Sequence, residues 1–144
     1  DTVYSPQVER VLRRIARLGD GWISRAVTNP ELMRKDWKHL QEYAVEYGRD
    51  PKEITFAHLN IISLTAESDT EKKEARERLS KISNMPFEDV EADYMIGTKA
   101  ETLARLDELV DLGVRYFVIW PTGFDYELLE WLESTALNRY ESVE

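Results

Sequence analysis

Few side chains in this sequence have the type and spacing needed for covalent chemistry. There are no cysteines, so disulfides and thiolate chemistry are excluded. No nucleophile stands with a base, no carboxylate pair is convincing, and no cluster has the spacing of a metal site. His39 falls in a predicted helix, where we expect it to be exposed rather than a ligand. The residues therefore predict binding, with any difficult chemistry left to a cofactor.

Two short stretches carry polar side chains that could contact a ligand. Arg25 and Thr28 follow a predicted strand and could meet an anionic part of a cofactor or substrate, although loop structure alone explains each of them. His58 and Asn60 lie on the even-numbered, more polar face of another predicted strand, which in a barrel could point inward. For His58 we favour a hydrogen-bonded core histidine over a ligand contact.

The first element that must position these groups is a helix followed at once by a strand. Ser5 can serve as the N-cap and Pro6 suits the first helical position, so a helix is predicted from there to Leu18. Its apolar residues recur at helical spacing and form one stripe: Val8, Val11, Leu12, Ile15 and Leu18. We expect Gly19 to end the helix in the left-handed conformation. A buried strand is predicted at Trp22-Ile23.

The rest of the chain repeats the alternation of helix and strand. The predicted elements, in order, are a helix from Asn29-Pro30 to Tyr47, a strand 54–64 that is apolar on both faces, a helix 71–83 behind a Ser68/Glu71 capping box, a loop or short helical turn 84–94, a helix from the Thr98/Glu101 capping box to Gly113, a strand 114–120, and a helix from Tyr126 to about Arg139. Strands buried on both sides belong to parallel sheets covered by helices. The pattern therefore predicts an α/β fold of parallel βα units.

Composition limits the class of protein. The chain has 144 residues, is 42% hydrophobic and carries a net charge of -9, which suits a single domain with a real core. The negative charge argues against nucleic acid or an anionic membrane as a partner, and the basic run Arg10 to Arg17 is explained as a solvated helix face. No stretch approaches the ~20 apolar residues of a membrane span and no secretory leader opens the chain, so we expect a cytoplasmic protein.

Three stretches, in order along the chain, resemble one protein family. They are Leu12 to Ile23 (LRRIARLGDGWI), Gly48 to Ile54 (GRDPKEI), and Ile96-Gly97-Thr98 followed by Glu101, Leu106, Gly113-Val114 and the strand Tyr116 to Trp120. Together these residues are similar to the C-terminal half of luciferase-like, flavin- or deazaflavin-dependent monooxygenases and reductases. The resemblance implies that residues 1–144 are one domain, forming the C-terminal part of a TIM (β/α)8 barrel of the luciferase-like type. Eight strands close such a barrel, so it is incomplete here. A fragment of a larger protein and a natural short protein both remain open.

The resemblance also implies a cofactor site. In the family the cofactor phosphate lies before the helix that leads to Asp20-Gly21-Trp22, which here is the segment Asp1 to Ser5. Free N–H groups and the helix dipole attract an anion there, and the hydroxyls of Thr2 and Ser5 could add donors. The two glycines usual at this place are absent, and ordinary helix capping explains Ser5 equally well.

Two functions follow as hypotheses. The first is an oxidoreductase of the luciferase-like monooxygenase type, using reduced FMN or the deazaflavin coenzyme F420 on a small organic substrate, and inactive by itself if the chain is a fragment. The second is a non-catalytic α/β module that associates with a partner chain through its exposed sheet edge, because an open barrel leaves unpaired strand edges. In either case we expect a homo-oligomer or association with the missing half of the barrel.

Overall fold

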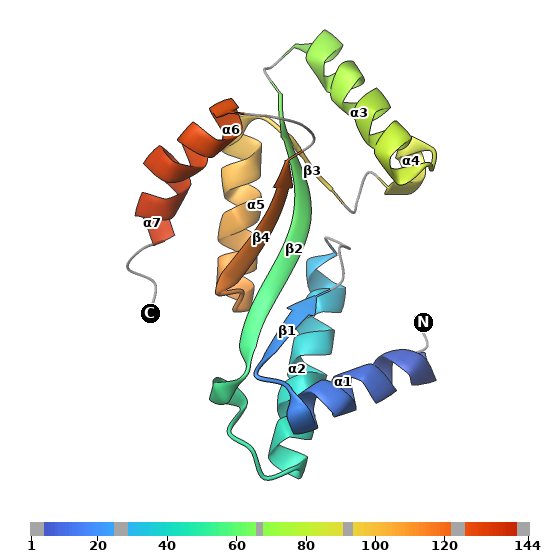
Figure 1. The fold of residues 1–144 in the computed structure, drawn as a ribbon, viewed down its shortest axis with the longest axis vertical. Helices are drawn as coiled ribbons and strands as arrows, with labels where there is room; N and C mark the ends of the chain where they lie inside the picture. Colours follow the sequence, from blue (N-terminus) through green and yellow to red (C-terminus); the bar gives the residue numbers. More distant parts are fainter. Residues whose placement is uncertain (1–4, 25–28, 66–67, 91–93, 122–125, 141–144) are drawn as a thin grey trace. The chain divides into compact units, whose positions relative to one another are not determined.

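The computed structural model describes residues 5–24, 29–65, 68–90, 94–121 and 126–140 (Figure 1). Helices and strands alternate, as predicted. In chain order the elements are α1 (Pro6–Leu18), β1 (Gly21–Ser24), α2 (Pro30–Glu46), the 3-10 turn η1 (Pro51–Glu53), β2 (Thr55–Leu64), α3 (Asp69–Ser83), α4 (Phe87–Val90), β3 (Met95–Gly97), α5 (Lys99–Leu112), β4 (Tyr116–Pro121), α6 (Tyr126–Trp131), the π-helical stretch η3 (Leu132–Leu137) and α7 (Asn138–Tyr140).

The four described strands form one open sheet around β2. Strand β1 pairs with β2 in parallel, with Gly21 opposite Thr55 and Ser24 opposite His58. Strand β3 pairs with β2 in parallel farther along, with Ile62 opposite Met95. Strand β4 also pairs with β2 and runs in the same direction (Figure 1). The predicted α/β fold of parallel βα units is therefore confirmed.

The sequence analysis missed strand β3. It is three residues long, which is too short to show the alternation of apolar and polar residues typical of a strand. Its pairing with β2 defines it as a strand. The Asn60 side chain, from β2, accepts a hydrogen bond from the Met95 N–H at 3.2 Å.

The chain divides into two compact units, which share strand β2. The first comprises Asp1–Leu59 and Leu109–Val118. In it α1 packs on α2, and three rings stack in the core: the Phe56 ring centroid lies 4.8 Å from that of Trp22 and 4.8 Å from that of Trp37. Trp22 and Phe56 are opposite each other in the β1–β2 register, so strand pairing assembles this core.

The second unit comprises Asn60–Glu108 and Ile119–Glu144. Helix α3 contacts α4 and β3, and its buried residues are Ala75 and Leu79, so it packs by a narrow apolar edge. The final helix was predicted as one element, but its middle is the π-helical stretch η3, which the sequence pattern does not distinguish.

The ends of the first two helices differ from each other. Ser5 caps α1 as predicted, but Gly19 is extended (φ -94, ψ 148), so the expected left-handed ending is wrong there. Space is tight at this position instead, because a Cβ would lie 3.1 Å from the carbonyl oxygen of Ile15. Helix α2 does end in left-handed backbone, at Gly48 (φ 72).

Arginine 49 completes the end of α1. Its Nη1 donates to the carbonyl oxygens of Gly19 at 2.7 Å and Ala16 at 3.2 Å, which are groups that a helix terminus leaves free. A cation at this pole also suits the helix dipole. Two of the stretches that carry the family resemblance are therefore joined by one side chain.

Of the helices that the structure describes, none combines the length and apolar character needed to cross a membrane.

Candidate ligand-binding site

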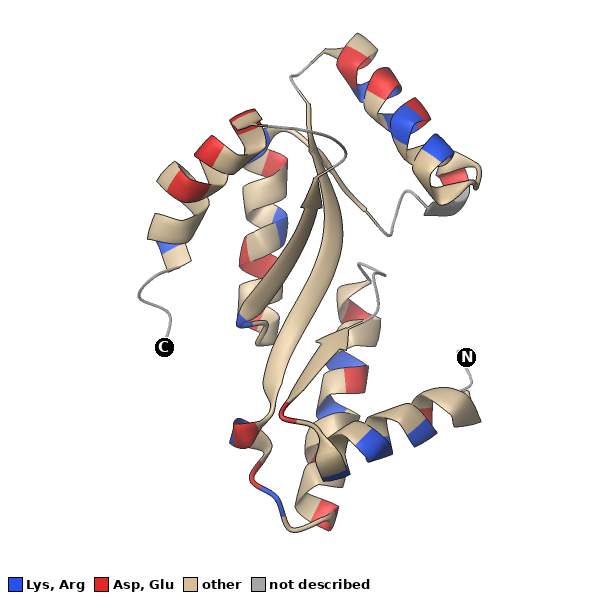
Figure 2. Cartoon of the chain, in the orientation of Figure 1, with Lys and Arg blue, Asp and Glu red and all other residues tan. Residues whose placement is uncertain are grey.

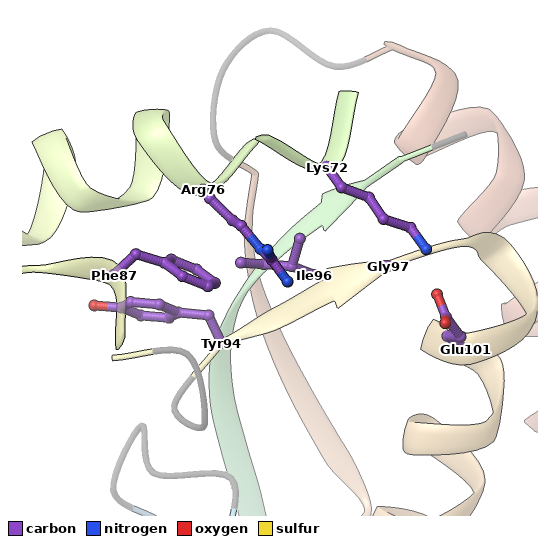
Figure 3. Close-up of a pocket in the computed structure, with 7 residues that line it drawn as sticks. All are labelled: Lys72, Arg76, Phe87, Tyr94, Ile96, Gly97 and Glu101. Carbon is purple, nitrogen blue, oxygen red and sulfur yellow. The ribbon is translucent and has the colours of Figure 1, made fainter. Parts of the chain in front are cut away.

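A small cavity lies in the second unit, where strand β3 ends and helix α5 begins (Figure 3). Its volume is about 150 Å³. The lining residues come from α3, α4, the segment entering β3, β3 itself and α5: Lys72, Arg76, Phe87, Tyr94, Ile96, Gly97 and Glu101. Carboxyl ends of parallel strands are where α/β proteins place their ligands. We therefore take this cavity as the candidate site.

The acidic side of the cavity is a closed capping box. Glu101 accepts a hydrogen bond from the Thr98 N–H at 2.8 Å, and its own N–H donates to the Thr98 hydroxyl at 3.2 Å, as the sequence predicts. These hydrogen bonds, and then the charge of Lys72, hold the pKa of Glu101 below its usual range. The carboxylate is therefore ionised at neutral pH and accepts hydrogen bonds rather than donating a proton.

The basic side of the cavity comes from one face of α3. Lys72 and Arg76 are four residues apart, so they lie on adjacent turns, and in Figure 3 both side chains reach into the cavity. The Arg76 guanidinium also lies 5.2 Å from the Phe87 ring centroid, a cation–π contact. Figure 3 shows the rings of Phe87 and Tyr94 beside each other at the same end.

This arrangement can bind an anionic group. Among the lining residues two cations stand beside one carboxylate, and an arginine fork with a lysine point charge matches a carboxylate or phosphate. Sites for whole drug-sized ligands have roughly 300–1,000 Å³, so the cavity fits one anionic group rather than a complete flavin. Sequence reasoning missed the site because only the fold brings α3 to β3. The sequence signal that could have pointed to the site is the placing of Lys72 and Arg76 four residues apart on α3, next to buried Ala75.

The structure places only one of the four predicted cofactor residues. Ser5 accepts a hydrogen bond from the Gln7 N–H at 3.2 Å and lies 2.6 Å from its side-chain oxygen, so it acts as the ordinary N-cap of α1. It belongs to the first unit and does not line the cavity. Thr2, Arg25 and Thr28 lie outside the described residues. Their role in cofactor binding therefore stays a prediction.

Both histidines of the sequence contact side chains of neighbouring residues in the fold. His58 is fully buried, with Nδ1 2.6 Å from the Ser24 hydroxyl on the neighbouring strand, which confirms a hydrogen-bonded core histidine. His39 is half-buried, with its ring centroid 6.1 Å from that of Tyr43, so the expectation that it is exposed was wrong. Helix α2 also buries Asp36. Among the described residues no group of three His, Asp or Glu could hold a metal ion.

Comparison with known proteins gives a structural match without a sequence match. No protein-family model matches the chain, and no curated protein does either. One similar solved structure is a monooxygenase from Streptomyces bottropensis, with a TM-score of 0.66 and 13% identity; the match covers 93% of this chain and 46% of that one. A second is a coenzyme F420 dependent tetrahydromethanopterin reductase from Methanopyrus kandleri, with a TM-score of 0.64 and 15% identity, covering 91% of this chain and 48% of that one. A third is an F420-dependent secondary alcohol dehydrogenase in complex with an F420-acetone adduct, with a TM-score of 0.64 and 16% identity, covering 83% of this chain and 42% of that one.

These matches establish the fold. The chain folds as about half of a barrel of the luciferase-like type, so the predicted resemblance is confirmed at the level of the fold. The chain spans less than half the length of each of the three structures.

Proposed function

We propose that this chain is part of an oxidoreductase of the luciferase-like type that uses reduced FMN or coenzyme F420. The observation that carries the proposal is the structural match, which extends over 83–93% of the chain in the three structures above. Two of those proteins are described as F420-dependent. Because each is more than twice as long as the aligned region, catalysis is assigned to the completed barrel and partial ligand binding to this chain.

The cavity beside β3 supports a specific role within that function. Its cations and its size fit a phosphate or carboxylate, groups that FMN, F420 and many small substrates carry. When bound, the cofactor would supply hydride transfer or oxygen activation. Lys72 and Arg76 would bind and orient the anionic group, and ionised Glu101 would exclude a second anion from the site. The rings of Phe87 and Tyr94 would shield it from water.

Direct titration tests the proposal. FMN and F420 are added to the chain while their fluorescence is followed, for the wild type and for the Lys72→Gln/Arg76→Gln variant. We expect at least one cofactor to bind, and the variant to bind about tenfold or more weakly, because a charge-assisted hydrogen bond contributes roughly 1.5–3 kcal/mol. Lys73→Gln/Lys81→Gln is the matched control, since it removes the same charge from exposed positions of α3. If the chain binds neither FMN nor F420, the proposal is contradicted. If Lys72→Gln/Arg76→Gln binds the cofactor as tightly as the control variant does, the cavity is not the binding site.

A second candidate function is a non-catalytic module that associates with a partner chain. It is favoured by large apolar side chains that the strands leave exposed: Ile23 (59%), Tyr116 (63%) and Trp120 (62%). In a complete barrel protein such strand surfaces are covered. A chain that binds neither cofactor but forms a stoichiometric complex burying Trp120, seen as a change in its fluorescence, would favour this function.

A further inference from the structure

Helix α1 presents an exposed basic face with apolar neighbours. In Figure 2 several Lys and Arg positions, coloured blue, lie along the ribbon of this helix. A shallow groove of about 400 Å³ runs beside it, lined by Arg10, Val11, Arg13, Arg14, Arg17 and Tyr47. Val11 is 43% and Tyr47 is 42% exposed, so the groove combines cations with apolar surface.

Three of the four arginines are available to a partner. Arg13 is engaged within the chain: it pairs with Glu9 at 2.9 Å and Glu46 at 2.7 Å, and its guanidinium lies 3.8 Å from the Tyr43 ring centroid. In the described part of the chain Arg10, Arg14 and Arg17 form no ion pair. They are spaced four and three residues apart, which places them on one face of α1.

The C-terminal helix carries the complementary pattern. In α6 and η3 the exposed apolar residues are Tyr126 (73%), Leu129 (54%) and Leu137 (61%). Glu130 and Glu133 are exposed between them, and neither forms an ion pair within the described residues. The opposite face of these elements is buried through Leu128, Trp131 and Leu132. In the part of the chain that the structure describes, this acidic, partly apolar face is therefore exposed to solvent.

We propose that the α1 groove binds the α6–η3 face of a second copy of this chain. Charge complementarity supports this occupant, because Arg10, Arg14 and Arg17 meet Glu130 and Glu133 while the apolar residues of the two faces pack together. The groove's apolar wall favours a protein helix over nucleic acid, and the net charge of -9 repels a polyanion. The inference does not depend on the proposed oxidoreductase function.

Reciprocal charge reversal tests this interface. Sedimentation velocity measures self-association of the wild type, of Arg14→Glu/Arg17→Glu, and of Glu130→Lys/Glu133→Lys. We expect the wild type to self-associate in a salt-sensitive way, and each variant alone to associate about tenfold or more weakly, since like charges then face each other. An equimolar mixture of the two variants should associate again, because both of its α1–α6 contacts are complementary. Lys73→Glu/Lys81→Glu is the control of equal charge change and should behave as the wild type.

Several results would overturn the proposal. One is that the wild type stays monomeric at the highest attainable concentration. Another is that the equimolar mixture of the two variants fails to associate. A third is that the Lys73→Glu/Lys81→Glu control self-associates as weakly as the arginine variant. A fluorescent oligonucleotide that binds the wild type and is released by the arginine variant, without self-association, would reassign the groove to nucleic acid. Circular dichroism verifies that each variant is folded. If a reversal variant unfolds, Arg14→Gln/Arg17→Gln and Glu130→Gln/Glu133→Gln replace the pair, and unchanged association in both would equally refute the interface.

Discussion

At the scale of single residues, Gly97 leaves room for the Glu101 carboxylate in the candidate site. A Cβ at this position would lie 2.7 Å from the Glu101 Oε2 and 3.1 Å from the Glu101 Cβ. The same carboxylate closes the capping box of α5 through the Thr98 N–H. The absence of a side chain at position 97 therefore allows one carboxylate to cap the helix and line the cavity at once.

The substitution Gly97→Ala should break this arrangement. The methyl group displaces the Glu101 carboxylate, so we expect a loss of about 1 kcal/mol in the free energy of unfolding, the size of a lost helix cap. The pKa of Glu101, followed by NMR, should rise toward its ordinary value because its Thr98 hydrogen bonds lower it. A double-mutant cycle with Glu101→Ala is the control, since the two effects should be less than additive if they share this contact. Strict additivity would contradict the explanation.

At the scale of elements, the short helix α7 is held to α5 by one carboxylate. Asp107 accepts hydrogen bonds from Arg139 Nε at 2.9 Å, Arg139 Nη2 at 2.8 Å and the Tyr140 hydroxyl at 2.7 Å. The Arg139 hydrogen bond, followed by that of Tyr140, keeps the pKa of Asp107 below its usual value. The pair is open to solvent, with Arg139 51% and Asp107 36% exposed, so screening keeps its contribution small.

This contact should make the stability of the chain depend on pH. Because the folded-state pKa of Asp107 is lowered, its contribution is present above the unfolded value of about 3.9 and is lost as the pH falls through the folded value. Asp107→Asn should therefore cost at most about 1 kcal/mol at pH 7, with a difference from the wild type that shrinks on acidification below about pH 4. Urea unfolding at several pH values measures it. A difference that stays constant down to pH 2 would exclude the ionic contact as its cause.

At the scale of the whole chain, Phe56 joins segments that are far apart in the sequence. Its ring stacks against those of both Trp22 and Trp37, and its carbonyl oxygen accepts a hydrogen bond from the Arg115 N–H at 2.9 Å. It is 1% exposed. Strand β1, helix α2 and the entry to β4 therefore depend on one residue of β2.

Removing this ring should destabilise the fold strongly. We expect Phe56→Ala to lower the free energy of unfolding by about 3–5 kcal/mol, a large part of the 5–15 kcal/mol typical of a domain. Chemical denaturation followed by tryptophan fluorescence measures the loss, and the native spectrum should also change because two tryptophans contact the ring. Leu129→Ala, at a site that is 54% exposed, is the control and should stay within about 0.5 kcal/mol of the wild type. Equal losses in the two variants would contradict the assigned core.

The sequence by itself determined most of the helices and strands and their order. Capping boxes, N-cap residues and apolar spacing act between residues a few positions apart, so Ser5, Ser68 and Thr98 identify helix starts without any knowledge of the fold. The resemblance that pointed to a luciferase-like half barrel rests on the same local signals. The helix boundaries were therefore largely right, whereas the three-residue strand β3 was missed.

Only the tertiary structure decided where these elements meet. The cavity requires α3 to lie beside β3, and Arg49 reaches the end of α1 from thirty-three positions beyond Ala16. Strand pairing and side-chain packing between distant segments set these contacts, and no local spacing encodes them. For that reason the sequence identifies Ser5 as an N-cap, whereas only the fold gathers Lys72, Arg76 and Glu101 around one cavity.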